Sequence, residues 1–258
     1  MQNLTVALLQ CDLHWENPTK NFTAITECLE SNTASFDLLV LPEMFSTGFT
    51  MNSEDFAEPW NQSKSVAFLQ SLSLKHNAAI YASVPISEEG NHYNRGVFVE
   101  NGKVKAYYDK RKLFAYAGEE LAYSAGSKKC IVNCKGWKIN LQICFDLRFP
   151  EISRNTFDFE NGYEQDLTVY VANWPSSRIP HWNALLKGRA IENQEFAIGV
   201  NRIGTDGKGY GYSGSTQAIH PGGEVLMKAN DHQMELCVLA LDYKDLYAYR
   251  SKFPFLKS

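Results

Sequence analysis

The sequence predicts an α/β protein in which strands and helices alternate from end to end. Short, β-branched apolar runs recur along its 258 residues, and segments with apolar residues every three to four positions separate several of them. An Asn-Gly pair between two strand-like runs adds a hairpin. The chain has no composition break, linker or internal repeat, so we expect a single domain over residues 1–258, with ten or more strands in two sheets.

The first third of the chain has the pattern of three strands joined by helices. The strands are predicted over residues 5–10, 37–42 and 79–84. Asn17-Pro18 is a typical helix start, and helical spacing follows it through Phe22, Ile25 and Leu29. A second helical pattern runs through Val66, Leu69 and Leu72. Because the runs are continuously apolar and joined by helices, we expect parallel strands buried on both faces.

The rest of the chain is predicted to contain a hairpin and then a mixture of strands and helices. Asn101-Gly102 lies between strand-like runs at 96–100 and 103–108. Further strands are expected at 137–144, 167–172, 197–201, 214–219 and 235–241, with helices at 150–156 and 182–194. Residues 247–258 form an expected tail, which Phe253, Phe255 and Leu256 would dock on the body.

Composition excludes several classes of function. The 25 basic and 29 acidic residues give a net charge of −4, without the basic excess of nucleic-acid-binding domains. No run of about 18 apolar residues indicates a membrane span, and no signal-peptide pattern is visible, so we expect a cytoplasmic protein. The six cysteines are scattered, which favours reduced thiols. Cys130 and Cys134 lack a second Cys or His pair, so no metal is expected.

Three reactive side chains lie where predicted strands end. Glu43 follows the 37–42 strand, Lys110 ends the second hairpin strand, and Cys144 ends the 137–144 strand. Ligands of α/β sheets usually bind at the carboxyl ends of strands, so these side chains are candidates for one site. Taken one at a time, such residues are most often a solvated loop carboxylate, a surface lysine and an inert buried thiol.

The blocks around these residues resemble, in order, the three signature motifs of the nitrilase (carbon–nitrogen hydrolase) superfamily. They read Leu-Pro-Glu at 41–43, Tyr-Asp-Lys-Arg-Lys-Leu-Phe at 108–114 and Ile-Cys-Phe-Asp-Leu-Arg-Phe-Pro-Glu at 143–151, and similar segments follow at 189–194, 212–215 and 221–224. The resemblance covers nearly the whole chain. It implies a four-layer α-β-β-α sandwich, a Glu43–Lys110–Cys144 triad and no cofactor.

The resemblance also implies an accessory glutamate and a homodimer. The accessory glutamate lies before a small-Gly pair, here Ala125-Gly126; Glu119 matches best by spacing, and Glu120 beside it stays open. Relatives pair through the helices beside the nucleophile block. Lys112 stands where many relatives have His, so we expect altered surroundings for Lys110, not an inactive enzyme.

The three residue types suit amide hydrolysis. A thiol is only a few per cent thiolate at pH 7, so a neighbouring carboxylate that accepts its proton would activate Cys144. Glu43 would take that proton, return it to departing ammonia and then deprotonate the water that hydrolyses a thioester. Lys110 and the main-chain N–H of Phe145 would hold the oxyanion, a contact that typically contributes ~3 kcal/mol.

Within the superfamily the sequence is most similar to the ω-amidase branch, which hydrolyses 2-oxo acid monoamides such as 2-oxoglutaramate and 2-oxosuccinamate. The similarity rests on residues 41–49, 173–175 and 181–190. The substrate carboxylate needs a cation or several N–H donors in a small pocket. The candidates are Arg148, Arg178 and Arg202, although Arg148 also fits a structural ion pair; the implied pocket walls are Phe45, Phe145 and Trp174.

Other functions remain open at this point. N-carbamoyl amino acid, deaminated glutathione and nitrile substrates suit the same nucleophile. A non-catalytic or thiol-sensing protein on the same fold is a different class of function. Residues 209–214 match the G-x-G-x-x-G pattern of dinucleotide-binding proteins, but a strand and Pro221 follow where that motif requires a helix.

Overall fold

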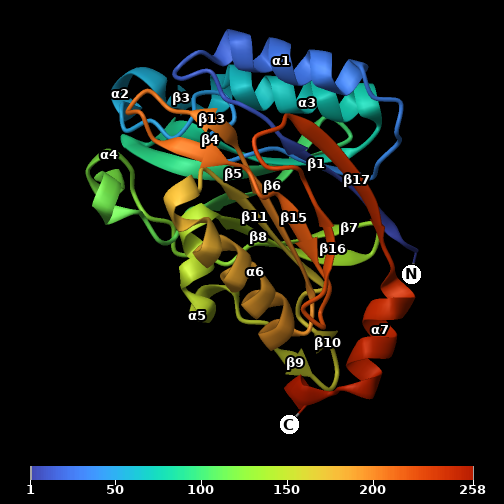
Figure 1. Cartoon of the computed structure of the whole chain (residues 1–258). Helices are drawn as coiled ribbons and strands as arrows, with labels where there is room; N and C mark the ends of the chain where they lie inside the picture. Colours follow the sequence, from blue (N-terminus) through green and yellow to red (C-terminus); the bar gives the residue numbers. More distant parts are fainter. Residues whose placement is uncertain (1, 258) are drawn as a thin grey trace.

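The computed structural model describes residues 2–257, which form two sheets packed face to face with helices on both outer faces (Figure 1). The first sheet has seven strands in the order β17-β1-β2-β4-β5-β6, with β3 paired to β4. They are β1 (Leu4–Gln10), β2 (Leu38–Val40), β3 (Glu58–Pro59), β4 (Ala79–Glu88), β5 (Asn91–Glu100), β6 (Lys103–Asp109) and β17 (Glu235–Leu241). The helices α1 (Pro18–Glu30) and α3 (Lys64–His76) cover this sheet.

The second sheet has six strands in the order β16-β15-β12-β11-β8-β7. They are β7 (Ile131–Cys134), β8 (Trp137–Ile143), β11 (Leu167–Ala172), β12 (Phe196–Asn201), β15 (Gln217–Ile219) and β16 (Val225–Lys228). Helix α6 (Ile179–Asn193) packs on its outer face, through Trp182, Leu186 and Ala190. The layers therefore follow the order α-β-β-α, which confirms the expected fold class.

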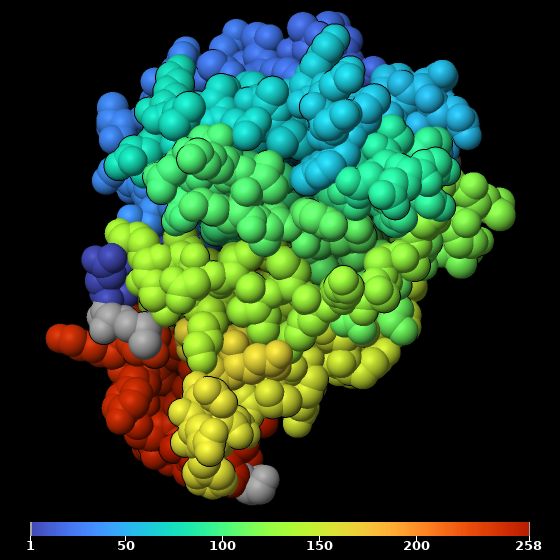
Figure 2. All heavy atoms as spheres, turned by 180° about the vertical axis from the view of Figure 1, so that it is seen from behind, coloured from blue at the N-terminus to red at the C-terminus, as the bar shows by residue number. Residues whose placement is uncertain are grey.

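Shorter elements join these layers. The remaining helices are α2 (Ser53–Phe56), α4 (Glu119–Ala122), α5 (Pro150–Ser153) and α7 (Tyr243–Lys252). Two small hairpins pair β9 (Phe157–Asp158) with β10 (Gly162–Tyr163) and β13 (Ile203–Thr205) with β14 (Gly211–Ser213). On the face seen from the opposite side, residues of the first half of the chain cover the upper part and residues of the second half cover the lower part (Figure 2).

Strand β1 shows why the sequence builds two layers of core. Val6 and Leu8 belong to the cluster between the sheets, whereas Ala7 and Leu9 belong to the cluster beneath α1 and α3. Successive side chains point to opposite faces, so a continuously apolar strand is buried on both. The pairing of β1 with β2 and of β2 with β4 is parallel, as predicted.

Three predictions about element boundaries need correction. The tail expected at 247–258 begins inside α7, which starts at Tyr243, while Ser258 lies outside the described residues. Helix α6 begins at Ile179, three residues before its predicted start, and the strand expected at 214–219 is reduced to β15. Helix α7 docks through two buried side chains: Leu246 joins the core cluster, and Arg250 pairs with Asp166 at 2.7 Å. Helical spacing of apolar residues could not reveal such a helix.

None of the helices in the described part of the chain has the length and apolar character needed to cross a membrane.

Candidate active site

Glu43 follows the end of β2 and is fully buried. The next residue, Met44, has a φ of +45°, and its N–H donates to Ser83 Oγ, so the chain turns sharply here. The main-chain N–H of Asn173, which follows β11 in the second sheet, donates to Glu43 Oε2 at 2.9 Å. Glu43 is therefore held at the point where the two sheets meet.

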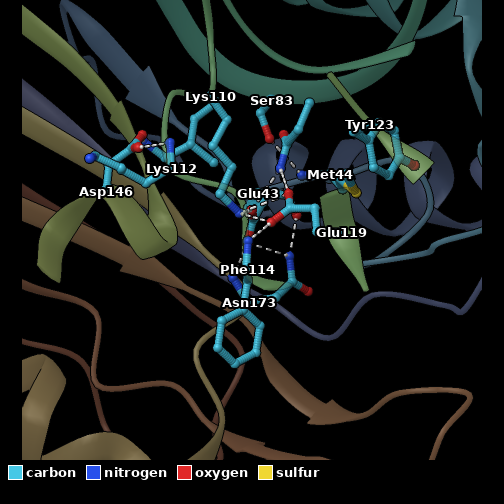
Figure 3. A network of polar contacts seen from close by, with 12 residues as sticks. Glu43, Met44, Ser83, Lys110, Lys112, Phe114, Glu119, Tyr123, Asp146 and Asn173 are labelled. Atoms are coloured by element: carbon cyan, nitrogen blue, oxygen red, sulfur yellow. Dashed lines mark hydrogen bonds and ion pairs between the residues drawn. The ribbon is translucent and has the colours of Figure 1, made fainter. Parts of the chain in front are cut away.

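Lys110 follows β6 and is also fully buried. Its Nζ donates to Glu43 Oε1 and to both carboxylate oxygens of Glu119, each at 2.9 Å (Figure 3). Burial alone would lower the pKa of Lys110, but attraction to Glu119 and Glu43 outweighs it and raises the pKa. The amine stays an ammonium ion at neutral pH.

Glu119 is the first residue of α4 and has no exposed surface, whereas Glu120 is exposed. Burial raises the pKa of Glu119, which Lys110 only partly offsets. The N–H of Phe114 also donates to Glu119 Oε2, at 2.6 Å. The chain then returns to β6, where Gly126 N–H donates to the Lys110 carbonyl. A Cβ at Gly126 would lie 2.2 Å from the Asp109 oxygen, so only glycine allows this close return.

Cys144 begins a single 3-10 turn directly after β8 and has a φ of +44°. Such a left-handed conformation is strained for a non-glycine residue and is often found at functional sites. Burial raises the pKa of the thiol well above its ordinary value; the charge of Glu43 raises it further, and Lys110 opposes them. At neutral pH the resting side chain is a neutral thiol.

Asp146 ties the turn that begins at Cys144 to the segment that follows β6. Its carboxylate accepts hydrogen bonds from the N–H groups of Ile143 and Lys112 and from the hydroxyl of Tyr108. Burial raises the pKa of Asp146 to about 6, and Lys110 and these donors limit the rise. The Lys112 side chain points elsewhere, to Glu151 at 3.4 Å.

A cavity of about 210 Å³ opens onto Cys144 and Lys110. Phe145 and Trp174 line it, as expected from the sequence, together with Phe49 and Phe114. Phe45 does not: it is fully buried beneath the helices and packs against Phe22 and Phe68 at centroid distances of 5.9 and 6.0 Å. The prediction for Phe45 was wrong because the sharp turn at Met44 directs the two neighbouring side chains to opposite sides.

The three candidate arginines have different surroundings. Arg202 is fully buried and pairs with Asp12 at 2.7 Å, away from the cavity. Arg148 and Arg178 both line the cavity and lie over the rings of Trp174 and Phe114. Within residues 2–257 neither has a carboxylate within 4.0 Å, so the alternative of a structural ion pair for Arg148 is not realised. Burial lowers the pKa of Arg148, and the neighbouring Arg178 lowers it further.

Sequence reasoning missed Asn94 as a member of the site. Its side-chain amide donates to Glu43 Oε1 at 2.8 Å and to Glu119 Oε1 at 3.2 Å. Asn94 lies within β5, far from any recognised motif, so no sequence signal marked it. In the described part of the chain no three His, Cys, Asp or Glu side chains are grouped to hold a metal ion.

Comparison with known proteins agrees with this arrangement. Residues 5–251 match the family model described as carbon-nitrogen hydrolase. The chain is 42% identical to the omega-amidase YafV of Escherichia coli strain K12, over 98% of this chain and 96% of that protein. It is 32% identical to the 2-oxoglutaramate amidase of Bacillus subtilis strain 168, over 86% of this chain and 85% of the relative.

A solved structure extends the likeness to three dimensions. The CN-hydrolase superfamily protein XC1258 of Xanthomonas campestris, which has an arsenic adduct in its active site, is 36% identical with a TM-score of 0.95, over 100% of this chain and 97% of that one. The chain belongs to the carbon–nitrogen hydrolase family, the nitrilase superfamily, and it is a hydrolase that acts on amides.

Proposed function

We propose that this enzyme hydrolyses the terminal amide of small 2-oxo acid monoamides, such as 2-oxoglutaramate and 2-oxosuccinamate, to the 2-oxo dicarboxylic acid and ammonia. One observation carries the proposal: the Cys144–Glu43–Lys110 cluster opens on a cavity lined by two arginines without acidic partners. The first feature suits attack on an amide, and the second suits a substrate with a carboxylate. The relatives named for omega-amidase and 2-oxoglutaramate amidase activity support the same substrates.

In the proposed mechanism the raised pKa of the thiol makes proton transfer part of the attack. Cys144 Sγ bonds to the amide carbon while Glu43 takes the thiol proton. Lys110 and the N–H of Phe145 hold the oxyanion. Glu43 returns the proton to nitrogen, the C–N bond breaks, and ammonia leaves a thioester on Cys144.

In the second half of the reaction Glu43 acts as a base again, with a water molecule in place of the thiol. Glu43 takes a proton from a water molecule, whose oxygen attacks the thioester carbon. The C–S bond then breaks, the carboxylic acid leaves, and the sulfur regains the proton from Glu43. Glu119 bonds to Lys110 through both oxygens in the resting site and limits how far its ammonium moves as it turns to the oxyanion.

Charge in the cavity favours an anion over a zwitterion. Arg148, Arg178 and Lys208 line it, and its one lining acid, among the described residues, is Asp206. The Asp206 carboxylate already accepts hydrogen bonds from the N–H groups of Lys208 and Tyr210 and from the Tyr212 hydroxyl. A 2-oxo acid presents only a carboxylate to these groups, whereas glutamine adds an ammonium that they repel.

A substrate panel read by ammonia release tests the proposal. We expect the highest kcat/KM for 2-oxoglutaramate, above glutamine, asparagine, N-carbamoyl amino acids, deaminated glutathione and nitriles; equal turnover of 2-oxoglutaramate and glutamine would reject the substrate assignment. Cys144→Ala should abolish turnover at an unchanged melting temperature. Mass spectrometry of the wild type should trap the acyl group on Cys144; a fully active Cys144→Ala variant would exclude the mechanism.

Arg178→Gln tests the recognition of the carboxylate. Loss of a charge-assisted contact should lower kcat/KM for 2-oxoglutaramate about ten- to hundred-fold, mainly through KM, and leave turnover of the uncharged amide butyramide unchanged. Arg148→Gln should act in the same direction. Arg154→Gln, which removes an exposed guanidinium away from the cavity, is the matched control. Equal losses on both amides would show that Arg178 does not bind the carboxylate.

We also propose that the enzyme is a cytoplasmic homodimer. All six cysteines are free thiols, which suits a reducing compartment. Ile191, nearly half exposed on the outer face of α6, suits pairing of two copies through this helix. Light scattering should give twice the chain mass, and Ile191→Glu should shift it toward the monomer.

A further inference from the structure

The side chain of Asn94 contacts both buried glutamates of the site. It lies in β5 and is fully buried, and it is not among the residues that line the cavity. Its single side-chain nitrogen donates to one oxygen of Glu43 and to one oxygen of Glu119. Its main-chain carbonyl accepts from Lys110 N–H at 3.0 Å. Asn94 therefore contacts three members of the site without access to substrate.

The hydrogen-bonding capacity of Lys110 explains why such a residue is needed. An ammonium has three N–H groups, and Lys110 directs contacts to three carboxylate oxygens in the resting site. To hold an oxyanion, it must weaken at least one of them. A buried carboxylate that loses its partner is strongly destabilised. The amide of Asn94 has two N–H groups, one for each carboxylate, that stay in place when Lys110 turns.

The opposite face of β5 fixes the position of Asn94. The next residue, Arg95, is buried between the rings of Trp60, Tyr93 and Tyr107. It pairs with Asp109 of β6 at 2.6 Å and with Glu88 of β4 at 2.8 Å. Since Arg95 and Asn94 point to opposite faces, this clamp sets the register that directs Asn94 into the site.

We propose that Asn94 is a positioning residue: its amide holds Glu43 and Glu119 in their reactive geometry and favours the deprotonated form of the pair while Lys110 turns to the oxyanion. This inference rests on the mechanism proposed above. The titratable groups that face the two carboxylates are Lys110, Cys144, Tyr81 and Tyr123. Asn94 is the neutral donor shared by both carboxylates, and Asp146 acts on the cluster from behind Lys110.

Alkylation of Cys144 by iodoacetamide, followed by mass spectrometry across pH 4 to 9, tests this without an amide substrate. Removing donors from a carboxylate favours its protonated form. The alkylation rate falls at low pH, and we call this part of the rate–pH curve the acid limb. In Asn94→Ala the acid limb should therefore move to higher pH, by about one unit. With 2-oxoglutaramate, kcat should fall about ten- to hundred-fold at a nearly unchanged KM. Asn94→Ser, which keeps one donor, should lie between Asn94→Ala and the wild type.

A matched control separates positioning from mere structure. Asn140 is equally buried in β8 and bonds only to Thr168 and Gln142, so Asn140→Ala should lower the melting temperature and leave the acid limb in place. If the Asn94 variants lose melting temperature while their acid limb coincides with that of the wild type, the proposal is wrong. If Asn94→Ala does not fold, the Asn94→Ser profile decides. Failure of the proposed thioester mechanism would give a different result, because no acyl group would then be trapped on Cys144 of the wild type.

Discussion

Three equally buried glutamates of this protein lie in two different surroundings: two share a cation, and one bonds to neutral groups. Glu43 and Glu119, with no exposed surface, share the ammonium of Lys110. Glu195, directly before β12, is just as buried, yet its carboxyl group bonds to Thr168 Oγ1 at 2.6 Å and to the amide of Asn193. The first group is built around a cation, and the second around neutral polar groups.

The difference sets the charge of each group. Burial raises the pKa of Glu195 from its ordinary 4.5 to about 8, because its neutral donors, with Arg250 beyond ion-pair distance, offset only part of the cost of desolvation. At neutral pH it is a protonated, structural side chain. Near Lys110, burial also raises the pKa of Glu119, but the ammonium opposes that rise directly, and attraction to the carboxylates raises the pKa of Lys110 itself. A buried glutamate is thus a candidate for acid–base chemistry because of its partner, not because of its burial.

The largest expected effect is that of Lys110→Met, which removes the cation. We expect no measurable ammonia release and a loss of about 3–5 kcal/mol in unfolding free energy at pH 8, because two buried carboxylates lose their partner. The loss should shrink toward pH 5, because burial raises the pKa of Glu119 and this carboxylate then takes up a proton. Urea unfolding at both pH values measures it.

The matched control is Lys75→Met, which breaks the exposed pair with Glu30. It should leave activity intact and change the unfolding free energy little. If Lys110→Met behaves like Lys75→Met, the Lys110 cluster is not a charged centre, and the contrast with Glu195 fails.

A smaller effect is expected for Glu119→Gln. The variant keeps the shape of the side chain but removes one of the two anions that hold Lys110, so the ammonium moves toward Glu43. A displacement of this kind costs on the order of 100-fold in kcat. Glu120→Gln, beside it on the exposed side of α4, should retain wild-type kcat. The reverse result would make Glu120 the accessory glutamate.

The strands were predictable because their physics is local. Strand β1 and its neighbours are continuously apolar, and Asn101-Gly102 supplies two consecutive positive φ angles, 52° and 68°, for the hairpin. The start of α1 was equally visible, since the Asn17 side chain caps it at Lys20 N–H. Helix α7 was missed because the ion pair of Arg250 with Asp166 joins residues far apart in sequence.

The site was predictable only in part, for the same reason. Motif residues such as Cys144 and Lys110 were marked by the resemblance of their flanking blocks. The arginines that face the cavity could not be separated from Arg202, because all three lie beside motif segments and only the fold pairs Arg202 with Asp12. Asn94 had no local signal at all, since its importance depends on two carboxylates that lie 51 and 25 positions away.

The smallest expected effect on activity, and the test most specific to the comparison, is that of Glu195→Gln. The folded-state pKa of Glu195 is raised above its unfolded value, so its contribution to stability is fully present below about pH 4.5 and is lost as pH rises to about 8. Glutamine mimics the protonated acid and has no such loss. The variant should match the wild type near pH 4.5 and be more stable by a few kcal/mol above pH 8, with ammonia release retained. Urea unfolding curves at pH 5, 7 and 9 that run parallel for the two proteins would mean that Glu195 is ionised in the folded state, and burial without a cation would then not suffice to keep a glutamate neutral here.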